Sequence, residues 1–440
     1  MRKPGSLLAG LLLLLSGQLS AEVRSLTILH TNDLHAHLSP LNNGRGGFAY
    51  LATALRRERA GCNDCIVLNA GDLVQGDPVS TIFQGVPVFE IANLLGFDAA
   101  TLGNHDFDYG WEQTRKFISI AKYPIVSCNI VDAAGKLFAQ PYVVLKVNGL
   151  RIGILGAMLT GLRDVATARS LGEWHTLPVV ETARKYAAEL RPKTDLIVLL
   201  GHIDGREELQ FLREAPEISV IVSGHLHTGL TEPISHEGRV AVRVRSYSEE
   251  FGRLELKVDT EKKAAIAWNW KRIPVDSKVI APDAEIAAKV KHWEGEVSSR
   301  VDRPLAISER VFTTAEVRRL IEHAMRDETG ADFAFMNSGG VRESLPKGQL
   351  YERNIWEIMP FDNLVVVGTF KGHDLPKVVV GDRKIDPDRD YTLAVSDFTA
   401  ANQATNENLR STGLKFPRDA GVMRDLLIDW FRKQKIISHQ

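Results

Sequence analysis

The sequence predicts an α/β fold: a layered β-sandwich flanked by helices, followed by a second, smaller α/β domain. Two observations support this prediction. From Leu26 to about Trp270, short apolar runs alternate with amphipathic stretches, a pattern typical of α/β domains. After a polar segment with a proline at each end, Pro274 and Pro282, a long amphipathic stretch precedes a second series of helical and strand-like segments. We therefore expect a first domain at residues 26–273, a helical linker at 274–302 and a second domain at 303–440.

Periodicity places the individual elements. In the first domain, amphipathic stretches predict helices at residues 47–59, 86–95, 111–121 and 179–190. The stretches 239–258 and 264–273 alternate apolar and polar residues, so we expect antiparallel strands that close the domain. Beyond them, the same reasoning predicts helices at 283–301, 315–328 and 419–434, and strands at 332–336, 364–370 and 391–395.

The composition limits the classes of function. The chain has 440 residues, 44% of them hydrophobic, and a formal net charge of -1. This balance indicates a soluble globular protein and does not favour binding to a nucleic acid polymer or to an anionic membrane surface. We therefore expect a monomer that acts on a small molecule.

The first residues predict a secretory signal. Arg2 and Lys3 make the start of the chain basic, Leu7 to Leu15 are almost continuously apolar, and Leu19 to Ala21 offer small residues at a cleavage position. The apolar run is shorter than the ~20 residues that a spanning helix requires. We expect residues 1–21 to be removed and the mature protein to be periplasmic or extracellular, without stable membrane insertion. The alternative is an N-terminal anchor that is never cut.

Three cysteines are too few for disulfides to hold a chain of this length together. Cys62 and Cys65 lie in a polar loop, where we expect a local disulfide or two free thiols. A redox pair or half of a zinc site is less consistent with the sequence, because no second cysteine pair follows. Cys128 lies in an apolar run and is expected to be buried and inert.

Ligand-type side chains follow five of the strand-like runs. In open α/β folds, ligands bind beyond the carboxyl ends of strands, so these side chains are expected to meet at one edge. They are Asp33 and His35, Asp72, Asn104 and His105, His202, and His225 and His227. A single His-x-His pair is more often a polar turn, but five such strand ends together indicate a metal centre.

The ligand types narrow the choice of metal. Carboxylate, amide and imidazole groups without a thiolate suit Zn, Mn, Fe or Co. Two such ions about 3.5 to 4 Å apart can hold both the attacking and the leaving oxygen of a displacement at phosphorus. Asp72 is the predicted bridging ligand, because Gly71 before it lets the loop approach closely and because it falls between the other ligands in the chain.

Five blocks of the sequence resemble the signature motifs of the calcineurin-like metallophosphoesterases: Asp33-Leu34-His35, Gly71-Asp72, Gly103-Asn104-His105-Asp106, Gly201-His202 and Gly224-His225-Leu226-His227. More narrowly, residues 31–35 and 103–108 resemble the secreted 5'-nucleotidase branch. Residues 337–342 and 359–363 are similar to the motifs of that branch's substrate domain. The resemblance covers nearly all of the chain beyond the signal.

The resemblance implies two divalent metal ions and a catalytic pair. The two ligand sets would be Asp33, His35, Asp72 and His227 for one ion, and Asp72, Asn104, His202 and His225 for the other. Nucleotidases of this branch often carry Gln at the position of His227, whereas the wider superfamily uses His there. The catalytic pair maps to His105 and Asp108, and an imidazolium there could stabilise phosphoryl oxygens and protonate the leaving alkoxide. The alternative for His105 is a supporting hydrogen bond to a metal ligand.

The resemblance also implies substrate contacts in the second domain, at Asn337, Gly340, Arg342, Phe361 and Asn363. The Arg342 guanidinium could pair with a phosphate or with hydroxyl groups across a cleft. Its alternative is a salt bridge to Glu343 or another acid. Phe361 and Asn363 could line the pocket or only form a turn.

Part of the expected substrate domain is missing from this sequence. Relatives bind the nucleoside base between two aromatic rings, but only residues 376–383 stand where one ring-bearing segment is expected, and residues 399–406 contain neither Gly nor Tyr. An aromatic pair contributes about 0.5 to 1.5 kcal/mol beyond its buried area. We therefore expect weak discrimination between nucleotides and other phosphate esters.

These inferences favour a hydrolase of phosphoric ester bonds: an exported, dinuclear-metal phosphoesterase that cleaves phosphate monoesters, with nucleoside 5'-monophosphates as the leading substrates. Alternatives within the same class are a cyclic-nucleotide or sugar-nucleotide phosphodiesterase and a broad-specificity phosphatase without a base clamp. A different class, a metal- and nucleotide-binding protein without catalysis, is disfavoured because both ligand sets and the pair His105 and Asp108 are complete.

Overall fold

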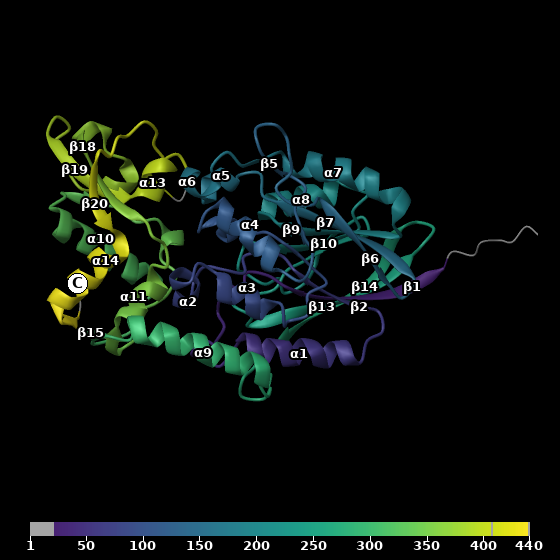
Figure 1. Ribbon diagram of the computed structural model, residues 1–440. Helices are drawn as coiled ribbons and strands as arrows, with labels where there is room; N and C mark the ends of the chain where they lie inside the picture. The colour runs from purple at the N-terminus through teal and green to yellow at the C-terminus, as the bar shows by residue number, and fades with distance from the viewer. Residues whose placement is uncertain (1–21, 406–407, 439–440) are drawn as a thin grey trace, which may run out of the picture.

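The computed structural model describes residues 22–405 and 408–438, so the predicted signal segment lies outside the described residues. A large α/β body continues into a smaller α/β unit, which is drawn in green and yellow in Figure 1. The predicted fold class is confirmed, since the large body is a sandwich of two sheets with helices on its outer faces.

Two six-stranded sheets form the sandwich. The order in the first sheet is β14 (Ala264–Pro274), β13 (Glu250–Asp259), β1 (Val23–Thr31), β2 (Cys65–Asn69), β3 (Ala99–Thr101) and β4 (Ile125–Val126). The order in the second sheet is β11 (Ile234–His236), β12 (Arg239–Val242), β10 (Val220–Gly224), β9 (Leu196–His202), β7 (Leu150–Met158) and β6 (Tyr142–Val147). The central strands of each sheet are parallel.

Both faces of the central strands are buried, which explains their nearly continuous apolar sequences. In β9, Val198 and Leu200 point into the core between the sheets, whereas Ile197 and Leu199 pack against the outer helices. The two-residue period of a strand separates these two sets. Helices α7 (Val179–Leu190) and α8 (Gly205–Glu214) cover this outer face.

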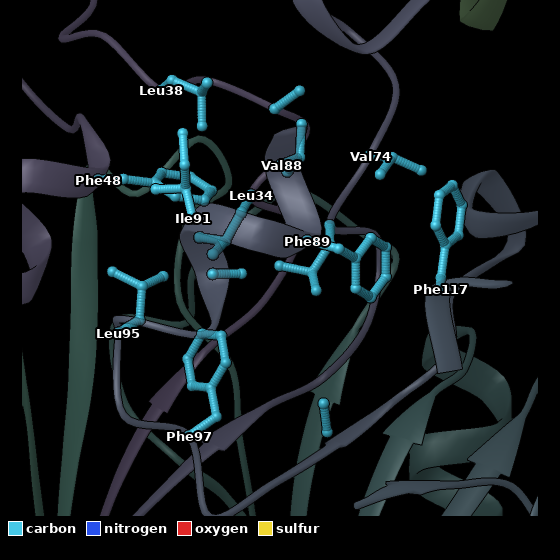
Figure 2. Close-up of a cluster of buried hydrophobic side chains, with 14 of the residues drawn as sticks. Leu34, Leu38, Phe48, Val74, Val88, Phe89, Ile91, Leu95, Phe97 and Phe117 are labelled. Carbon is cyan, nitrogen blue, oxygen red and sulfur yellow. The ribbon is translucent and has the colours of Figure 1, made fainter. Parts of the chain in front are cut away.

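The outer face of the first sheet is covered by α1 (Phe48–Ala60), α3 (Val86–Ala92) and α4 (Trp111–Ile120). Figure 2 shows part of this core, where Phe89 of α3 and Phe117 of α4 lie together with stacked rings whose centroids are 4.4 Å apart. The four helices predicted in this domain are therefore confirmed, with ends that differ by up to three residues.

Helix α9 (Ala284–Val301) connects the two parts. It begins at the cap Asp283, whose side chain accepts a hydrogen bond from the Ile286 amide, and it runs beside α1 toward the smaller unit (Figure 1). Arg353 of α11 (Glu352–Ile358) pairs with Glu294 and Asp302 at its far end.

The smaller unit contains two sheets and three main helices. The first sheet has the order β16 (Phe333–Ala334), β19 (Asp390–Ser396), β18 (Leu364–Lys371) and β20 (Arg418–Val422), and the second has β17 (Gly348–Tyr351), β15 (Pro304–Ser308) and β21 (Ile436–Ile437). Its core packs α10 (Thr314–Thr329), α11 and α14 (Met423–Gln434) against these sheets. Trp430 is fully buried there, and its ring nitrogen donates to Asp327 at 2.8 Å.

Two predicted elements were partly wrong. The expected closing helix begins at Met423 rather than at Asp419, because Gly421 has φ 95°, outside the helical range, and its neighbours form β20 instead. The stretch 239–258, predicted to supply antiparallel strands, does so only in part. Its first part, β12, pairs in parallel with β10 in the second sheet, and only β13 and β14 form the expected antiparallel hairpin.

The structure also shows the state of the cysteines and the length and polarity of the helices. Cys62 and Cys65 form a disulfide, and Cys128 is buried, which raises the pKa of its thiol to about 12. Within residues 22–405 and 408–438, no helix is both long and apolar enough to span a bilayer.

Candidate metal centre

The predicted ligands meet where the parallel strands of both sheets end. β1, β2 and β3 deliver Asp33 and His35, Asp72, and Asn104, while β9 and β10 deliver His202 and the pair His225 and His227. Because the sandwich sets the two strand edges side by side, side chains from sequence positions nearly 200 residues apart come into contact.

The backbone is strained at these positions. Asp33, His35, Asp72, His225 and His227 all have φ between 47° and 88°, a region that non-glycine residues rarely adopt and that costs roughly 1–3 kcal/mol per residue. Such conformations persist where the surroundings hold them and are concentrated at functional sites.

Backbone hydrogen bonds hold the strained loops together. The Asp33 amide donates to Gly71 O at 3.0 Å and the His35 amide to Asp72 O at 3.0 Å. A Cβ on Gly71 would lie 2.8 Å from both Gly103 N and His202 Nδ1, so only glycine fits there. This close approach agrees with the role predicted for Gly71.

One group of candidate ligands is Asp33, His35, Asp72 and His227, whose ligand atoms all lie within 4.8 Å of one another. His35 Nε2 is 2.9 Å from His227 Nε2 and 3.6 Å from Asp72 Oδ2. His35 Nδ1 faces the carbonyl oxygen of Val74 at 3.3 Å, so a proton on Nδ1 leaves the lone pair of Nε2 toward the centre. Burial, followed by the positive charge of Arg342, lowers the pKa of His227 to about 3, which keeps this imidazole neutral.

The second group contains Asn104, His202 and His225 beside the same Asp72. His202 Nε2 lies 3.1 Å from Asn104 Oδ1 and 3.2 Å from Asp72 Oδ2, and His225 Nδ1 lies 3.0 Å from Asn104 Oδ1. His202 Nδ1 faces the Ala70 carbonyl at 2.8 Å and donates to it. Its Nε2 lone pair therefore points at two oxygens that are themselves acceptors, an arrangement that requires an extra proton or a cation.

Asp72 joins the two groups. Its Oδ1 accepts a hydrogen bond from the His105 amide at 2.9 Å, whereas its Oδ2 is buried without any hydrogen-bond donor. That orphan oxygen is the atom that faces both His35 and His202. A buried, unpaired carboxylate oxygen is costly unless a cation is bound to it. The donor set, with oxygen and imidazole nitrogen and no thiolate, fits two divalent metal ions.

His105 stands next to the centre without belonging to either ligand group. Its Nδ1 is 2.8 Å from Asp108 Oδ2, which orients the ring and leaves Nε2 free. Burial lowers the pKa of His105, but the charges of Asp108 and Asp72 outweigh burial and raise it above its ordinary value. This geometry suits a proton donor, and the predicted pair His105 and Asp108 lies within hydrogen-bond distance.

Two of the predicted substrate residues reach the centre from the smaller unit. The ring of Phe361 lies 5.9 Å from that of His105, and the Arg342 guanidinium lies 6.0 Å from the Phe361 ring. Arg342 Nη1 donates weakly to Gly339 O at 3.4 Å, and its Nη2 is buried without a partner. Within the described part of the chain Arg342 forms no ion pair with Glu343 or with another acid, so its guanidinium remains available for a substrate.

The other three predicted substrate residues have structural contacts instead. Asn337 is buried, and a Cβ on Gly340 would lie 2.9 Å from its Oδ1, so both shape the loop that carries Arg342. The Asn363 carbonyl accepts the Met423 amide at the start of α14. None of the three makes a hydrogen bond to a candidate metal ligand within the described ranges.

Three further residues shape the centre and were not singled out from the sequence. Asn32 donates to Asp33 Oδ2 at 2.6 Å, and Asp106 accepts the Gly103 amide at 2.8 Å and the Leu73 amide at 3.1 Å. Tyr247 has φ 63°, and its ring lies 5.7 Å from His35 and 5.8 Å from His227. Asn32 and Asp106 stand inside motifs that the sequence displays, whereas Tyr247 had no local signal.

Comparison with known proteins assigns this architecture to a family. Residues 26–229 match the family described as calcineurin-like phosphoesterase, and residues 295–380 match the 5'-nucleotidase C-terminal domain. The chain belongs to the calcineurin-like phosphoesterases with a 5'-nucleotidase C-terminal domain. As a member, this calcineurin-like phosphoesterase is a hydrolase of phosphoric ester bonds, and its family uses divalent metal ions. The prediction of an enzyme is confirmed, and the non-catalytic alternative is not supported.

Individual relatives agree with this assignment. The 5'-nucleotidase of Vibrio cholerae is 26% identical over 415 residues, which cover 80% of this phosphoesterase and 74% of that protein. Endonuclease YhcR of Bacillus subtilis is 25% identical over 422 residues, and this chain spans only 34% of it. The crystal structure of a 5'-nucleotidase precursor from Thermus thermophilus shares the fold, with a TM-score of 0.85, 24% identity, and coverage of 94% of this chain and 97% of that one.

Proposed function

We propose that this phosphoesterase is an exported enzyme that uses two divalent metal ions to hydrolyse phosphate monoesters, with nucleoside 5'-monophosphates as the leading substrates. The observation that carries the proposal is the orphan Oδ2 of Asp72, which faces both groups of candidate ligands. One ion would be held by Asp33, His35, Asp72 and His227, and the other by Asp72, Asn104, His202 and His225.

The metal ions and the side chains of the protein have different roles in the proposed reaction. Bound divalent ions supply Lewis acidity toward phosphoryl oxygens and lower the pKa of water. The chain would supply the proton: His105 is held by Asp108 through Nδ1, and its Nε2 would donate a proton to the leaving alkoxide. The ring of Phe361 lies beside His105, with the ring centroids 5.9 Å apart.

Arg342 is proposed to bind the substrate. Its Nη2 is buried and unpaired, and its charge lowers the pKa of His37 and His227 after burial does, so its field reaches the centre from the smaller unit. A planar guanidinium with free donors suits a phosphate or a pair of hydroxyl groups.

Replacing Arg342 with Ala is expected to raise KM roughly 10- to 100-fold, the value of one charge-assisted hydrogen bond of about 1.5–3 kcal/mol, and to lower kcat less. Steady-state kinetics on a nucleoside monophosphate measure both constants. Arg342→Lys keeps the positive charge but loses the forked pair of donors. Its KM should therefore lie between that of the wild type and that of Arg342→Ala. An unchanged KM in Arg342→Ala would show that Arg342 does not bind the substrate.

A broad-specificity phosphatase is the second candidate, because the segment expected to carry one base-stacking ring is short. It contains only α12 (Lys377–Val380), and Phe398 on α13 (Asp397–Ala401) has no ring contact with Phe361 among the described residues. Without a clamp, the four nucleoside monophosphates should have similar kcat/KM values, and a sugar phosphate should compete with them.

A panel of nucleoside monophosphates, sugar phosphates, cyclic nucleotides and sugar nucleotides, assayed with Mn, Zn or Co, tests the proposal. Monoesters are expected to have the highest kcat/KM. Faster turnover of cyclic nucleotides or sugar nucleotides would replace the proposal by a phosphodiesterase, and a strong preference for one base would show that a base pocket exists.

Export is proposed from the signal-like residues 1–21 and is supported by the disulfide between Cys62 and Cys65, which suits an oxidising compartment. N-terminal sequencing of the mature protein should give a start near Glu22. An intact Met1 on the mature protein would contradict cleavage.

A further inference from the structure

An arginine-lined cavity of about 340 Å³ lies in the smaller unit, away from the metal centre. It opens between α10, β16 and α12, and Arg318, Arg319, Arg326 and Arg383 line it. Its lining residues include no candidate metal ligand and no predicted substrate contact. Its volume is within the range of small-molecule sites.

The cavity has an excess of positive charge. Its only lining acid is Glu322, against four guanidinium groups. The one ion pair within it is weak, with Arg318 Nε 4.0 Å from Glu322 Oε1, and in the described part of the chain the other three arginines pair with no acid. Like charges held together around one concavity attract an anion.

Hydrogen-bond donors in the cavity are also unused. Arg318 Nε is buried without a hydrogen-bond partner, and the exposed Arg319 makes no side-chain hydrogen bond within the described residues. Glu322 is already occupied, since it accepts the Met336 amide at 3.1 Å. A guanidinium carries five donors in a fixed fork that matches phosphate oxygens, so Arg318 and Arg319 together offer a phosphate site.

The floor of the cavity is apolar. Phe335 and Val379 line it, and each is 5% exposed. Arg383 at the rim lies 4.5 Å above the Phe333 ring and donates to the carbonyls of Val379 and Val380, which fixes it at the edge. A cationic rim over an apolar floor suits a ligand with a phosphate at one end and an apolar or planar group at the other.

We propose that this cavity binds a phosphorylated organic molecule of nucleotide size, with its phosphate on Arg318 and Arg319 and its organic part against Phe335 and Val379. The site is independent of the proposed hydrolytic function. It is nevertheless linked to the loop that carries Arg342, because Glu322 accepts a hydrogen bond from the Met336 amide at the start of that loop.

Calorimetric titration of the metal-loaded full chain tests the proposal. The probes are a nucleoside methylenediphosphonate, whose P–C–P bridge resists hydrolysis, and inorganic phosphate alone. The wild type should bind two equivalents of the nucleoside probe, one in the cleft and one in the cavity. In Arg318→Gln/Arg319→Gln the cavity site should weaken about tenfold or more, as the loss of charge-assisted hydrogen bonds predicts, while the cleft site remains.

Two further variants make the result specific. Arg206→Gln/Arg213→Gln removes the same charge from the exposed face of α8 and should leave both sites unchanged. Glu322→Gln should tighten the cavity site several-fold, because it removes the competing negative charge.

Three outcomes would overturn the proposal: two unaltered sites in the Arg318→Gln/Arg319→Gln variant, an equal loss in the α8 variant, or a single equivalent in the wild type that disappears in Arg342→Ala. Binding of phosphate alone as tightly as the nucleoside probe would refute the part played by Phe335 and Val379.

Discussion

Asp72→Ala is expected to abolish turnover and to reduce the bound metal from two ions per chain to one or none. Asp72 Oδ2 faces both His35 and His202, so its removal takes a ligand from both groups at once. Each group then keeps only three ligands, and the pair loses its bridge. Elemental analysis after metal loading, together with kcat/KM on a phosphate monoester, measures both effects.

The control for this experiment is Asp195→Ala. Asp195 is also buried and pairs with Arg151, but it precedes β9 and lies at the end of that strand opposite the metal centre. Its loss should lower the melting temperature without changing the metal content. If Asp72→Ala bound two ions and kept its activity, Asp72 would not be the bridge.

The candidate ligands could be predicted from the sequence because each follows an apolar strand. Parallel strands buried on both faces have continuous apolar sequences, as in β9, and their carboxyl ends meet at a common edge. Hydrophobic packing does not explain the polar residues that directly follow such runs, which therefore indicate a functional site. The positions of Asp33, Asp72 and His225 along the chain thus carried the information, whereas the distances between them depend on backbone angles that no local pattern specifies.

The contribution of the smaller unit was harder to predict. Phe361 reaches His105, and Arg342 lies beside Phe361, because α9 and α11 fix how the two parts meet, through contacts such as Arg353 with Glu294. Sequence periodicity describes each element but not the contact between units. Asn363 illustrates the difference, since it stands in the same motif as Phe361 but holds the start of α14 through its carbonyl.

Tyr247 was missed for a related reason. It lies where the chain leaves the second sheet at β12 and enters the first sheet at β13, and its amide donates to Asp33 O at 2.8 Å. The stretch 239–258 was predicted to belong to one set of antiparallel strands. The sequence therefore did not indicate that the chain crosses here from the second sheet to the first. The loop between β12 and β13 passes the edge of the sheets that bears the candidate ligands. There Tyr247, with φ 63°, places its ring beside His35 and His227.

His105→Ala is expected to lower kcat about 10²- to 10⁴-fold, the range for loss of a general acid, while two metal ions remain bound. His105 contacts the centre through its amide, which donates to Asp72 Oδ1 at 2.9 Å, and this bond does not depend on the side chain. Its imidazole is oriented by Asp108, and its ring packs against His35 at 5.3 Å and Phe361 at 5.9 Å without joining either ligand group. Metal content should therefore separate His105→Ala from Asp72→Ala. The exposed His292 on α9 supplies the matched control, and His292→Ala should leave kcat unchanged.

The leaving group distinguishes a general acid from a residue that only supports a ligand. An aryl phosphate such as p-nitrophenyl phosphate leaves as a stable phenolate and needs little protonation, whereas a nucleoside alkoxide needs a proton. The rate lost in His105→Ala should accordingly be much smaller on the aryl ester than on a nucleoside monophosphate. An equal loss on both esters, accompanied by a loss of metal, would show that His105 acts by holding Asp72 or another ligand in place.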